Sequence, residues 1–401
     1  MKIAFVTSSA EAGKDGMGDY TLSLAAALQS LGHSVLVIGL NDRWIEEGSA
    51  AATRDNADGV ALERLASTIP FPDRIDRACA RLTDFRPDWA SFQMSCYAYH
   101  PKGILFGVNR HLRRLAEACE NWQVMFQELW IAFQKDASLK NRIVGTLQRR
   151  SIKGGVCALR PKLLQTSTPL FRAMLRTIGI EASVLPLAGS IPVNPDAGVD
   201  WFLEALGKPG SPVAAEKRKE HLAGGFFGAI YPNWEPEPFF SSLRKVASKT
   251  GQKVTIFAAG RMGGGGEVIW DRLAPAYPDF RFHKLGELSF DRVSQYLRNL
   301  DFGIAATPWL AIGKSSATAA MLDHGIPVLV TRNDSQPRLR LDIEPPADPL
   351  LILADRDVSD RFLAGLPRRE PRHTARDLAA EFVRRMEQAQ SAPRFGSQRC
   401  G

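Results

Sequence analysis

The sequence has few cysteines, and they have no spacing that would organise a fold. The five cysteines are scattered and odd in number, and no two are spaced as Cys-x-x-Cys. We therefore expect neither a disulfide framework nor a structural zinc site, and a reducing cytoplasm fits best. The histidines are also scattered, with no pair at metal-ligand spacing. The cysteines are Cys79, Cys96, Cys119, Cys157 and Cys400.

Long apolar runs are absent as well. No uninterrupted run approaches about 18 residues, the length that a membrane-spanning helix needs. The opening residues, "MKIAFVTSSAEAGK", contain only a short apolar run before Thr7. This pattern predicts a buried strand and not a signal peptide.

The remaining composition is typical of a globular protein. The chain has 401 residues, of which 45% are hydrophobic and 23% are charged. This length predicts two domains of roughly 150–200 residues each. The formal net charge of +8 is compatible with an anionic substrate, an anionic membrane surface or nucleic acid, and equally with simple solubility.

The order of apolar runs predicts two α/β halves. "KIAFV" (2–6) is typical of a strand, residues 19–31 of a helix and "SVLVIGL" (34–40) of a second strand, which together form a βαβ unit. The runs do not alternate with polar residues, which favours a parallel sheet covered on both faces. The pattern restarts after a proline-rich linker, with strands expected at 224–230, 253–260, 280–286, 300–307 and 326–331.

We therefore expect an α/β protein of two tandem Rossmann-like, doubly wound domains that face a central cleft. The expected bounds are 1–193, 194–373, a C-terminal helix at 374–390 and a disordered polar tail at 391–401. For the helix, packing on the N-terminal domain is one option. Ligands of such sheets bind beyond the carboxyl ends of the strands, so the loops that follow strands are the candidate sites.

The loop after the first strand, "SSAEAGKDGMGDY", contains two glycines that would let backbone N–H groups approach a ligand. Gly16, Met17 and Gly18 precede Asp19, which we expect to cap the following helix. The alternative is a flexible turn with an N-cap and no ligand. A third glycine at the spacing of a dinucleotide fingerprint is missing.

Two loops in the second half carry cations beside glycines. In "PWLAIGKSSATAAML", Pro308 occupies the position of the first Walker A glycine, so a P-loop is excluded. Gly313, Lys314, Ser315 and Ser316 would still present N–H groups and an ammonium to a pyrophosphate, unless they form only a helix cap beside a solvated lysine. In "AAGRMGGGGEVIW", four consecutive glycines predict a mobile loop over a ligand, with Arg261 as a phosphate cation, or else a disordered surface hairpin.

Two loops in the first half carry polar and aromatic side chains after strands. "WASFQMSCYAYHPKGI" supplies Gln93, Tyr97 and Lys102, and "VMFQELW" supplies Gln127 and Glu128. Such groups suit a hydroxyl-rich ligand, which needs hydrogen bonds and a flat apolar surface. The alternative is an ordinary loop anchored by its aromatic residues.

Taken in order, these segments resemble a two-domain glycosyltransferase of the GT-B fold, similar to the retaining glycosyltransferase family 4. The resemblance covers most of the chain. It includes the opening strand with its glycine-rich loop, "VMFQELW" in place of the usual His-Glu-Leu-Trp, and the series "FFGAIYP", "AAGR", "LGEL", "DFGIAATPW" and "AAMLDHGIPVLV". The order and spacing of these segments are more specific than any one of them.

The resemblance implies transfer of a sugar, with retention, from a nucleotide-sugar donor to a saccharide, lipid-linked or small-molecule acceptor. Cations and helix dipoles would stabilise the leaving diphosphate, so neither a metal nor another cofactor is expected. The donor-binding residues would be Gly260, Arg261, Gly286, Glu287, Leu288, Gly313, Lys314, Ser315 and Ser316. The acceptor-binding residues would be Gly16, Met17, Gly18, Asp19, Gln93, Tyr97, Lys102, Gln127 and Glu128. Catalysis would depend on Gln127, Asp19, Lys314 and Arg261.

The chain departs from this family at residues that bear on activity. The family usually carries two glutamates eight residues apart around the donor turn, and alignment on "HGIPV" places Ile312 and Ala320 there. Gln127 replaces the common histidine, and glutamine does not titrate. The alternative function is therefore a catalytically silent relative that binds a nucleotide or a protein.

The expected partners are the sugar donor and an acceptor, without nucleic acid. Basic residues between 110 and 162 would favour an anionic membrane surface or a phosphorylated acceptor, or are solvated helix faces. The expected location is the cytoplasm, with peripheral contact at the inner membrane face as one option.

Overall fold

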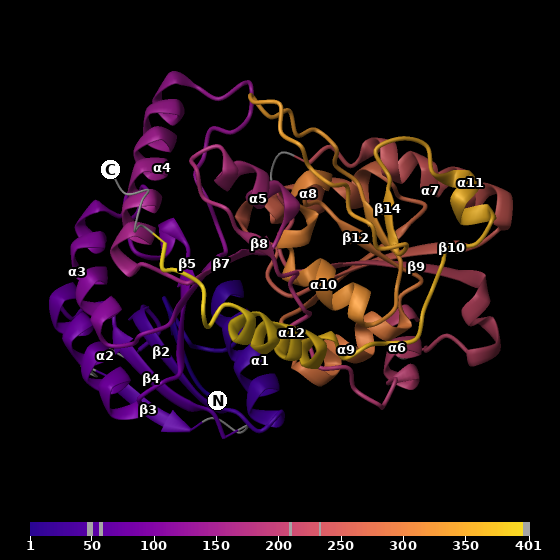
Figure 1. Ribbon diagram of the computed structural model, residues 1–401. Coiled ribbons are helices and arrows are strands. Elements are labelled where there is room, and N and C mark those ends of the chain that lie inside the picture. Colours follow the sequence, from indigo (N-terminus) through magenta and orange to yellow (C-terminus); the bar gives the residue numbers. More distant parts are fainter. Residues whose placement is uncertain (46–50, 56–58, 208–210, 232–233, 396–401) are drawn as a thin grey trace. The chain divides into compact units, whose positions relative to one another are not determined.

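The computed structural model describes residues 1–45, 51–55, 59–207, 211–231 and 234–395 (Figure 1). It divides into two compact units. Unit 1 comprises Met1–Leu187, Gln336–Glu344 and Ala375–Gly401, and unit 2 comprises Ala188–Ser335 and Pro345–Thr374. The chain therefore passes from one unit to the other four times.

Unit 1 is built on an eight-stranded sheet in the order β3-β4-β2-β1-β5-β6-β7-β8. All neighbouring strands are parallel except β3, which pairs antiparallel with β4. Four consecutive residues of β1, from Ile3 to Val6, are fully buried, and this requires that both faces of the sheet are covered. The strands are β1 (Lys2–Thr7), β2 (Ser34–Asp42), β3 (Ala51–Asp55), β4 (Ala61–Ala66), β5 (Trp89–Met94), β6 (Trp122–Phe126), β7 (Leu163–Thr166) and β8 (Ser183–Val184).

The helices of unit 1 follow the strands that they cover. They are α1 (Gly16–Ser30), α2 (Phe71–Phe85), η1 (Cys96–Ala98), α3 (Phe106–Glu117), α4 (Leu139–Leu159), α5 (Pro169–Arg176) and α12 (Thr374–Gln388). Helix α12, yellow in Figure 1, returns from the end of the chain, and its Phe382 stacks on Phe5 of β1 with ring centroids 5.8 Å apart. Arg385 donates to the Val184 carbonyl at 2.8 Å. The C-terminal helix thus packs on the sheet of unit 1.

Unit 2 contains a six-stranded, fully parallel sheet in the order β11-β10-β9-β12-β13-β14. The strand order reverses beside the first strand, as it does beside β1 in unit 1. This is the doubly wound, Rossmann-like arrangement expected from the apolar runs, and ligands of such sheets bind where the order reverses. The elements are α6 (Val199–Leu206), η2 (Ala215–Glu220), β9 (His221–Phe227), α7 (Glu237–Thr250), β10 (Lys253–Ala259), α8 (Gly264–Ala276), β11 (Arg281–Gly286), α9 (Phe290–Asn299), β12 (Phe302–Ala305), η3 (Trp309–Lys314), α10 (Ser316–Asp323), β13 (Val328–Val330), β14 (Leu351–Leu353) and α11 (Ser359–Leu363).

The boundary between the units lies at Leu187 and Ala188, earlier than the expected bounds of 1–193 and 194–373. The reason is local packing. The Gly189 N–H donates to the Asp323 carboxylate at 2.9 Å, and Ile191 belongs to the core of unit 2. The linker is therefore bound to unit 2 before the proline-rich stretch ends.

A segment that sequence reasoning placed wholly in the second domain belongs to unit 1. Between β13 and β14, Gln336–Glu344 runs along the loop that follows β6. Pro337 forms an antiparallel bridge with Gln134, and the Arg338 N–H donates to the Phe133 carbonyl at 2.8 Å. Arg172 of α5 forms an ion pair with Glu344 at 3.0 Å. These contacts explain why the two domains are not simple consecutive stretches.

The C-terminal tail differs from the expectation for 391–401 over its first residues. The Phe395 N–H donates to the Pro161 carbonyl at 2.8 Å, and Arg394 donates to the Glu120 carbonyl at 2.7 Å. Residues 391–395 are thus held on unit 1, while 396–401 lie outside the described residues. Cys157 is disulfide-bonded, although no disulfide framework was expected, and Cys79, Cys96 and Cys119 are free thiols.

The buried imidazole of His324 links α10 to α9 within unit 2. Its Nδ1 lies 2.7 Å from the Ala320 carbonyl oxygen, which can only accept, so Nδ1 carries the proton. Nε2 then accepts from the Ser294 hydroxyl at 2.8 Å. Burial lowers the pKa of His324 below its ordinary value.

This lowered pKa predicts a loss of stability in mild acid. Below about pH 6.5 the unfolded chain binds a proton at this residue more readily than the folded one, so the free energy of unfolding falls as pH falls. When the pH is lowered from about 7.5 to about 5.5, we expect the melting temperature of His324→Gln to fall less than that of the wild type. Ser294→Ala is the matched control, because it removes the hydrogen bond and keeps the titrating ring. Equal slopes for His324→Gln and wild type would contradict the assignment.

Candidate functional site

The carboxyl edge of the unit 2 sheet carries three neighbouring glycines with left-handed backbone. Gly228 follows β9, Gly260 follows β10 and Gly286 ends β11, with φ angles of 78°, 83° and 68°. The Gly228 N–H donates to the Ala259 carbonyl at 2.9 Å, and the Gly260 N–H donates to the Gly286 carbonyl at 2.7 Å. A residue with a side chain rarely adopts this conformation, so the edge is a rim of bare backbone. We call Gly228, Gly260 and Gly286 the glycine rim.

The turn that leads into α10 lies beside this rim. A Cβ atom built on Gly228 would lie 3.9 Å from the Cβ of Ala317, in the first turn of α10. Ser315 is the N-cap, and its hydroxyl accepts from the Thr318 N–H at 3.1 Å. The prediction of a helix cap is therefore confirmed for Ser315. The cap satisfies one of the N–H groups that a helix leaves unpaired at its first turn, and the others are suited to an anion.

The structure gives the two expected phosphate cations different surroundings. Lys314 is partly buried, and none of the carboxylates in the described ranges lies within 4.0 Å of its ammonium. Arg261 follows Gly260 and forms an ion pair with Glu287 at 3.8 Å, with side-chain exposures of 49% and 69%. An exposed ion pair of this kind contributes about 0–1 kcal/mol, so little free energy is lost when the Arg261 guanidinium leaves Glu287 for the anion of a ligand. Leu288 packs against the core of unit 2.

The two positions that would carry glutamates in the resembling family are part of the hydrophobic core. Ile312 is 2% exposed and Ala320 is 0% exposed. A Cβ built on Gly189 would lie 2.7 Å from the Ala320 Cα, so the linker backbone fills the space over this residue. Neither position carries a carboxylate in this chain, and both side chains lie in the packed core of unit 2.

Three of the four consecutive glycines are helical, and this corrects the expectation of a mobile loop or a disordered hairpin. Gly263 is the N-cap of α8, and Gly264–Ala276 is the helix itself. A Cβ built on Gly266 would lie 2.9 Å from the Ile230 carbonyl oxygen, so the absence of a side chain permits close packing. The function of the run is thus to bring α8 against the loop that follows β9.

In unit 1 the helix after the first strand starts earlier than expected. Asp15, and not Asp19, is the N-cap of α1, and its carboxylate accepts from the Met17 and Gly18 N–H groups at 3.0 and 2.8 Å. Asp19 instead accepts from the Gly13 N–H at 2.6 Å. Burial raises the pKa of Asp15, and the two backbone hydrogen bonds oppose this rise. The Asp19 N–H donates to the Asp15 carbonyl at 3.0 Å, so three N–H groups of the predicted glycine-rich turn 16–19 are already engaged.

The loop between β1 and α1 is fixed by a buried carboxylate at the end of β2. Asp42 ends β2 and accepts from the Ala10 N–H at 3.1 Å and from Arg64 Nε at 2.8 Å. Arg64 also forms an ion pair with Glu11. These contacts hold the loop close to α1, where a Cβ on Gly18 would lie 2.9 Å from the Ser9 carbonyl oxygen. Asp42 was missed because the predicted second strand stopped at residue 40.

A chain of buried amides crosses the same sheet. Gln127 Nε2 donates to Gln93 Oε1 at 3.0 Å, and Gln93 Nε2 donates to Ser91 Oγ at 2.7 Å. The Ser91 hydroxyl donates to Gln123 Oε1 at 2.5 Å, and Gln123 Nε2 donates to Gln165 Oε1 at 3.2 Å. All four donations run in one direction, from the end of β6 into the sheet. We call these five residues the amide relay.

The direction of the amide relay decides which atom Gln127 presents outward. Its Nε2 is used by Gln93, whereas no residue in the described part of the chain bonds its Oε1. Gln127 thus offers a carbonyl oxygen, which accepts a hydrogen bond from a hydroxyl group. The relay was partly foreseen through Gln93 and Gln127. Polar residues at alternate positions of apolar strands were the available signal for Ser91 and Gln123.

The other predicted acceptor residues are brought near α4. Gln148 Nε2 donates to the Tyr97 hydroxyl at 2.9 Å and to the Lys102 carbonyl at 2.8 Å, so the loop after β5 is tied to this helix. The Lys102 side chain is exposed. Glu128 is exposed too and accepts from the Ser95 hydroxyl at 3.0 Å. Tyr97 therefore has a structural partner, which favours the interpretation of an anchored loop for this residue.

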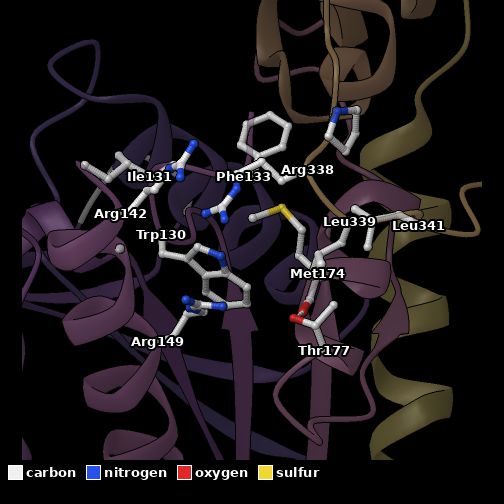
Figure 2. Close-up of a pocket in the computed structure, with 13 residues that line it drawn as sticks. Trp130, Ile131, Phe133, Arg142, Arg149, Met174, Thr177, Arg338, Leu339 and Leu341 are labelled. Atoms are coloured by element: carbon white, nitrogen blue, oxygen red, sulfur yellow. Dashed lines mark hydrogen bonds between the residues drawn. The ribbon is translucent and has the colours of Figure 1, made fainter. Parts of the chain in front are cut away.

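Unit 1 also contains a cavity of about 150 Å³ that no motif predicted (Figure 2). Its wall combines the loop after β6, helices α4 and α5, and Gln336–Glu344, which we call the returning segment. Figure 2 shows arginines and apolar side chains around the same space. The lining residues are Trp130, Ile131, Ala132, Phe133, Arg142, Gly145, Arg149, Met174, Thr177, Pro337, Arg338, Leu339 and Leu341.

Among the described residues, no helix combines the length and the hydropathy that spanning a membrane requires. Within the same ranges, no three or more His, Cys, Asp and Glu side chains gather in a way that could hold a metal ion.

No protein-family model matches the chain, and no curated protein matches it in sequence. Solved structures do match it. Sucrose-phosphate synthase from Thermosynechococcus elongatus has a TM-score of 0.53 at 13% identity, covering 98% of this chain and 95% of that one. A UDP-forming α,α-trehalose-phosphate synthase from Burkholderia vietnamiensis has a TM-score of 0.53 at 11% identity, covering 97% and 94%. HepE from Anabaena, in complex with UDP and glucose, has a TM-score of 0.51 at 13% identity, covering 97% and 91%.

These similarities extend over nearly the whole chain on both sides of each comparison. At such low identity they establish the architecture and leave the chemistry to the site residues. The chain has the GT-B fold, with two Rossmann-like units.

Proposed function

We propose that the protein is a glycosyltransferase that takes its sugar from a nucleotide-sugar donor. The observation that carries this proposal is the glycine rim beside the N-terminus of α10, with Lys314 next to it. Backbone N–H groups at a helix start, a side-chain-free edge and an ammonium together suit a pyrophosphate. Solved structures with the same fold support this choice, because HepE is in complex with UDP and glucose and the trehalose-phosphate synthase is UDP-forming.

In this proposal the protein's main task is to stabilise the charge that develops on the leaving nucleoside diphosphate. Lys314 and the first turn of α10 would act on it directly. Arg261 would join after exchanging Glu287 for a phosphate oxygen. Gly286, Glu287 and Leu288 would lie along the nucleoside. Because these cations supply the neutralising charge, the proposal requires no metal.

The acceptor would be positioned by unit 1. Transfer with retention needs little from a protein base, since the departing phosphate can take the acceptor proton on the same face of the sugar. Gln127 would accept a hydrogen bond from an acceptor hydroxyl through Oε1, held in place by the amide relay. Asp19, which is already bonded to the Gly13 N–H, would act through the loop geometry. A cytoplasmic role in polysaccharide or glycolipid synthesis is part of this proposal.

The alternative proposal is a silent relative that binds a nucleotide or a protein partner. Its specific support is that Ile312 and Ala320, which are both buried, stand where the resembling family carries its paired glutamates. The two proposals share the nucleotide site and differ in turnover.

Nucleotide binding gives the first test. We expect one of UDP, GDP, ADP or dTDP to raise the melting temperature of the wild type, since ligand at 100-fold its Kd adds about 2.7 kcal/mol. Lys314→Ala removes the ammonium of the residue that precedes the N-cap of α10 and should abolish most of this shift. Lys249→Ala, an exposed lysine on α7, is the matched control and should keep it. If no nucleotide shifts the wild type even at millimolar concentration, the donor site is refuted.

Restoring a family glutamate gives the second test. We expect Ala320→Glu to lose about 3 kcal/mol or more of unfolding free energy, because the carboxylate would be buried against Gly189 without a partner. Ala319→Glu places the same charge on the same helix at a partly exposed position and should lose much less. Urea unfolding measures both. An Ala320→Glu protein with native stability and tighter nucleotide binding would mean that position 320 faces the ligand.

The orientation of Gln127 gives the third test. With the donor identified by the melting experiment, we expect Gln127→Met to lower kcat/KM for the acceptor about tenfold, the value of roughly one hydrogen bond. The nucleotide-dependent shift in melting temperature should be unchanged, because Gln127 belongs to unit 1. Unchanged transfer in Gln127→Met would remove this residue from the acceptor site.

A further inference from the structure

The cavity of unit 1 is lined by three guanidinium groups, and no carboxylate of the described residues forms an ion pair with any of them. Arg142 and Arg149 come from α4 and Arg338 from the returning segment. Across the described residues, none of the three has a carboxylate oxygen within 4.0 Å. Arg142 donates to the Ala137 carbonyl and Arg149 to the Thr146 hydroxyl, each at 2.9 Å, so both side chains are held without losing their charge. Like charges gathered around one small space repel one another, and an anion would relieve this repulsion.

The other half of the cavity wall is apolar. Trp130 and Met174 are buried, and Phe133 and Leu341 complete this side. Leu339 is 55% exposed at the same cavity, which is high for a large apolar side chain. The site therefore joins a cationic part to an apolar part, as a ligand with an anionic head and an apolar body would require.

A second cavity in unit 2 shows what structural arginines look like in this protein. It is lined by Arg218, Arg298 and Arg368, among others. Arg218 is bonded to Asp301, Arg298 donates to the Asn194 carbonyl and Arg368 donates to the Leu300 carbonyl. Those guanidinium groups hold the fold together. Arg142 is held in the same way, by the Ala137 and Lys135 carbonyls. Within the described residues, Arg149 donates only to the Thr146 hydroxyl and the Arg338 side chain donates to no residue, so these two are the ones available to a ligand.

We propose that the unit 1 cavity binds a phosphate ester with an apolar substituent. Forked guanidinium groups match the oxygens of a phosphate, and three of them suit a dianion better than a carboxylate. A cavity of about 150 Å³ is large enough for one benzene ring or a branched five-carbon unit. A longer chain would leave the cavity past Leu339. If the protein is a glycosyltransferase as proposed above, this ester is the acceptor class, and only that assignment rests on the proposed function.

The experiment is calorimetric titration of the full chain with phenyl phosphate and geranyl phosphate. Phenol, geraniol and inorganic phosphate test each half of the ligand alone. We expect the esters to bind and the neutral alcohols not to bind, with inorganic phosphate clearly weaker than either ester. Arg338→Gln and Arg149→Gln should each weaken ester binding about tenfold or more, since each removes a charge-assisted contact. Leu339→Gln should weaken geranyl phosphate and leave inorganic phosphate unchanged.

Arg340→Gln is the matched control, because Arg340 lies on the same segment and does not line the cavity. It should bind the esters as the wild type does. Co-sedimentation with phosphatidylcholine vesicles, with and without phosphatidic acid, separates a lipid source from a free one. Capture by phosphatidic acid that is lost in Arg338→Gln identifies a lipid, and ester binding without capture identifies a soluble ester.

Three results would overturn the proposal: no ester binding at millimolar concentration, equal losses in Arg338→Gln and Arg340→Gln, or inorganic phosphate binding as tightly as the esters. Lys314→Ala should leave ester binding intact. The nucleotide experiment and this one can therefore fail separately.

Discussion

The burial of both faces of each parallel sheet is the constraint on which the rest of this structure depends. Within strands such as β1 no side chain of the central residues meets water, so the residues from Ile3 to Val6 are all apolar. Polar groups that must interact with a ligand are therefore confined to the carboxyl edge and to the loops beyond it. The glycine rim and the outer end of the amide relay both lie where strands end. The amide relay is the exception inside the sheet. Its members bond one another, and the buried Gln165 Nε2 at its inner end has no hydrogen-bond partner among the described residues.

The same constraint explains how much of the fold the sequence predicts. "KIAFV" and "KVTIFAAG" are apolar runs of strand length bounded by turns, and they are strands in the structure. The start of α1 was misplaced because Asp15 and Asp19 are both good N-cap residues, and only the tertiary position of the loop selects between them. The glycine run at 263–266 was misinterpreted because glycine costs helix stability in isolation, whereas here it permits α8 to pack against the Ile230 carbonyl.

The candidate site was predictable in its turns and not in its long-range contacts. Lys314 and Ser315 could be assigned to a helix start because capping is local. The ion pair between Arg261 and Glu287 joins two strand ends, and Gln165 is reached through three other side chains. The cavity depends on a segment about 200 residues away from the loop that it contacts, as Gln134 and Pro337 illustrate. Periodicity and spacing carry no information about such contacts, because they describe each stretch of chain by itself.

The returning segment and α12 make unit 1 discontinuous, and this bears on how such a chain can diversify. A single genetic crossover near residue 187 would exchange Ala188–Ser335 together with Gln336–Glu344 and the C-terminal helix. The recipient would gain a new unit 2 and, with it, a foreign wall for the cavity and a foreign partner for Phe5. Properties encoded by the two units cannot be recombined as independent modules. They must change together, or the exchange must use several crossovers that spare both returning pieces.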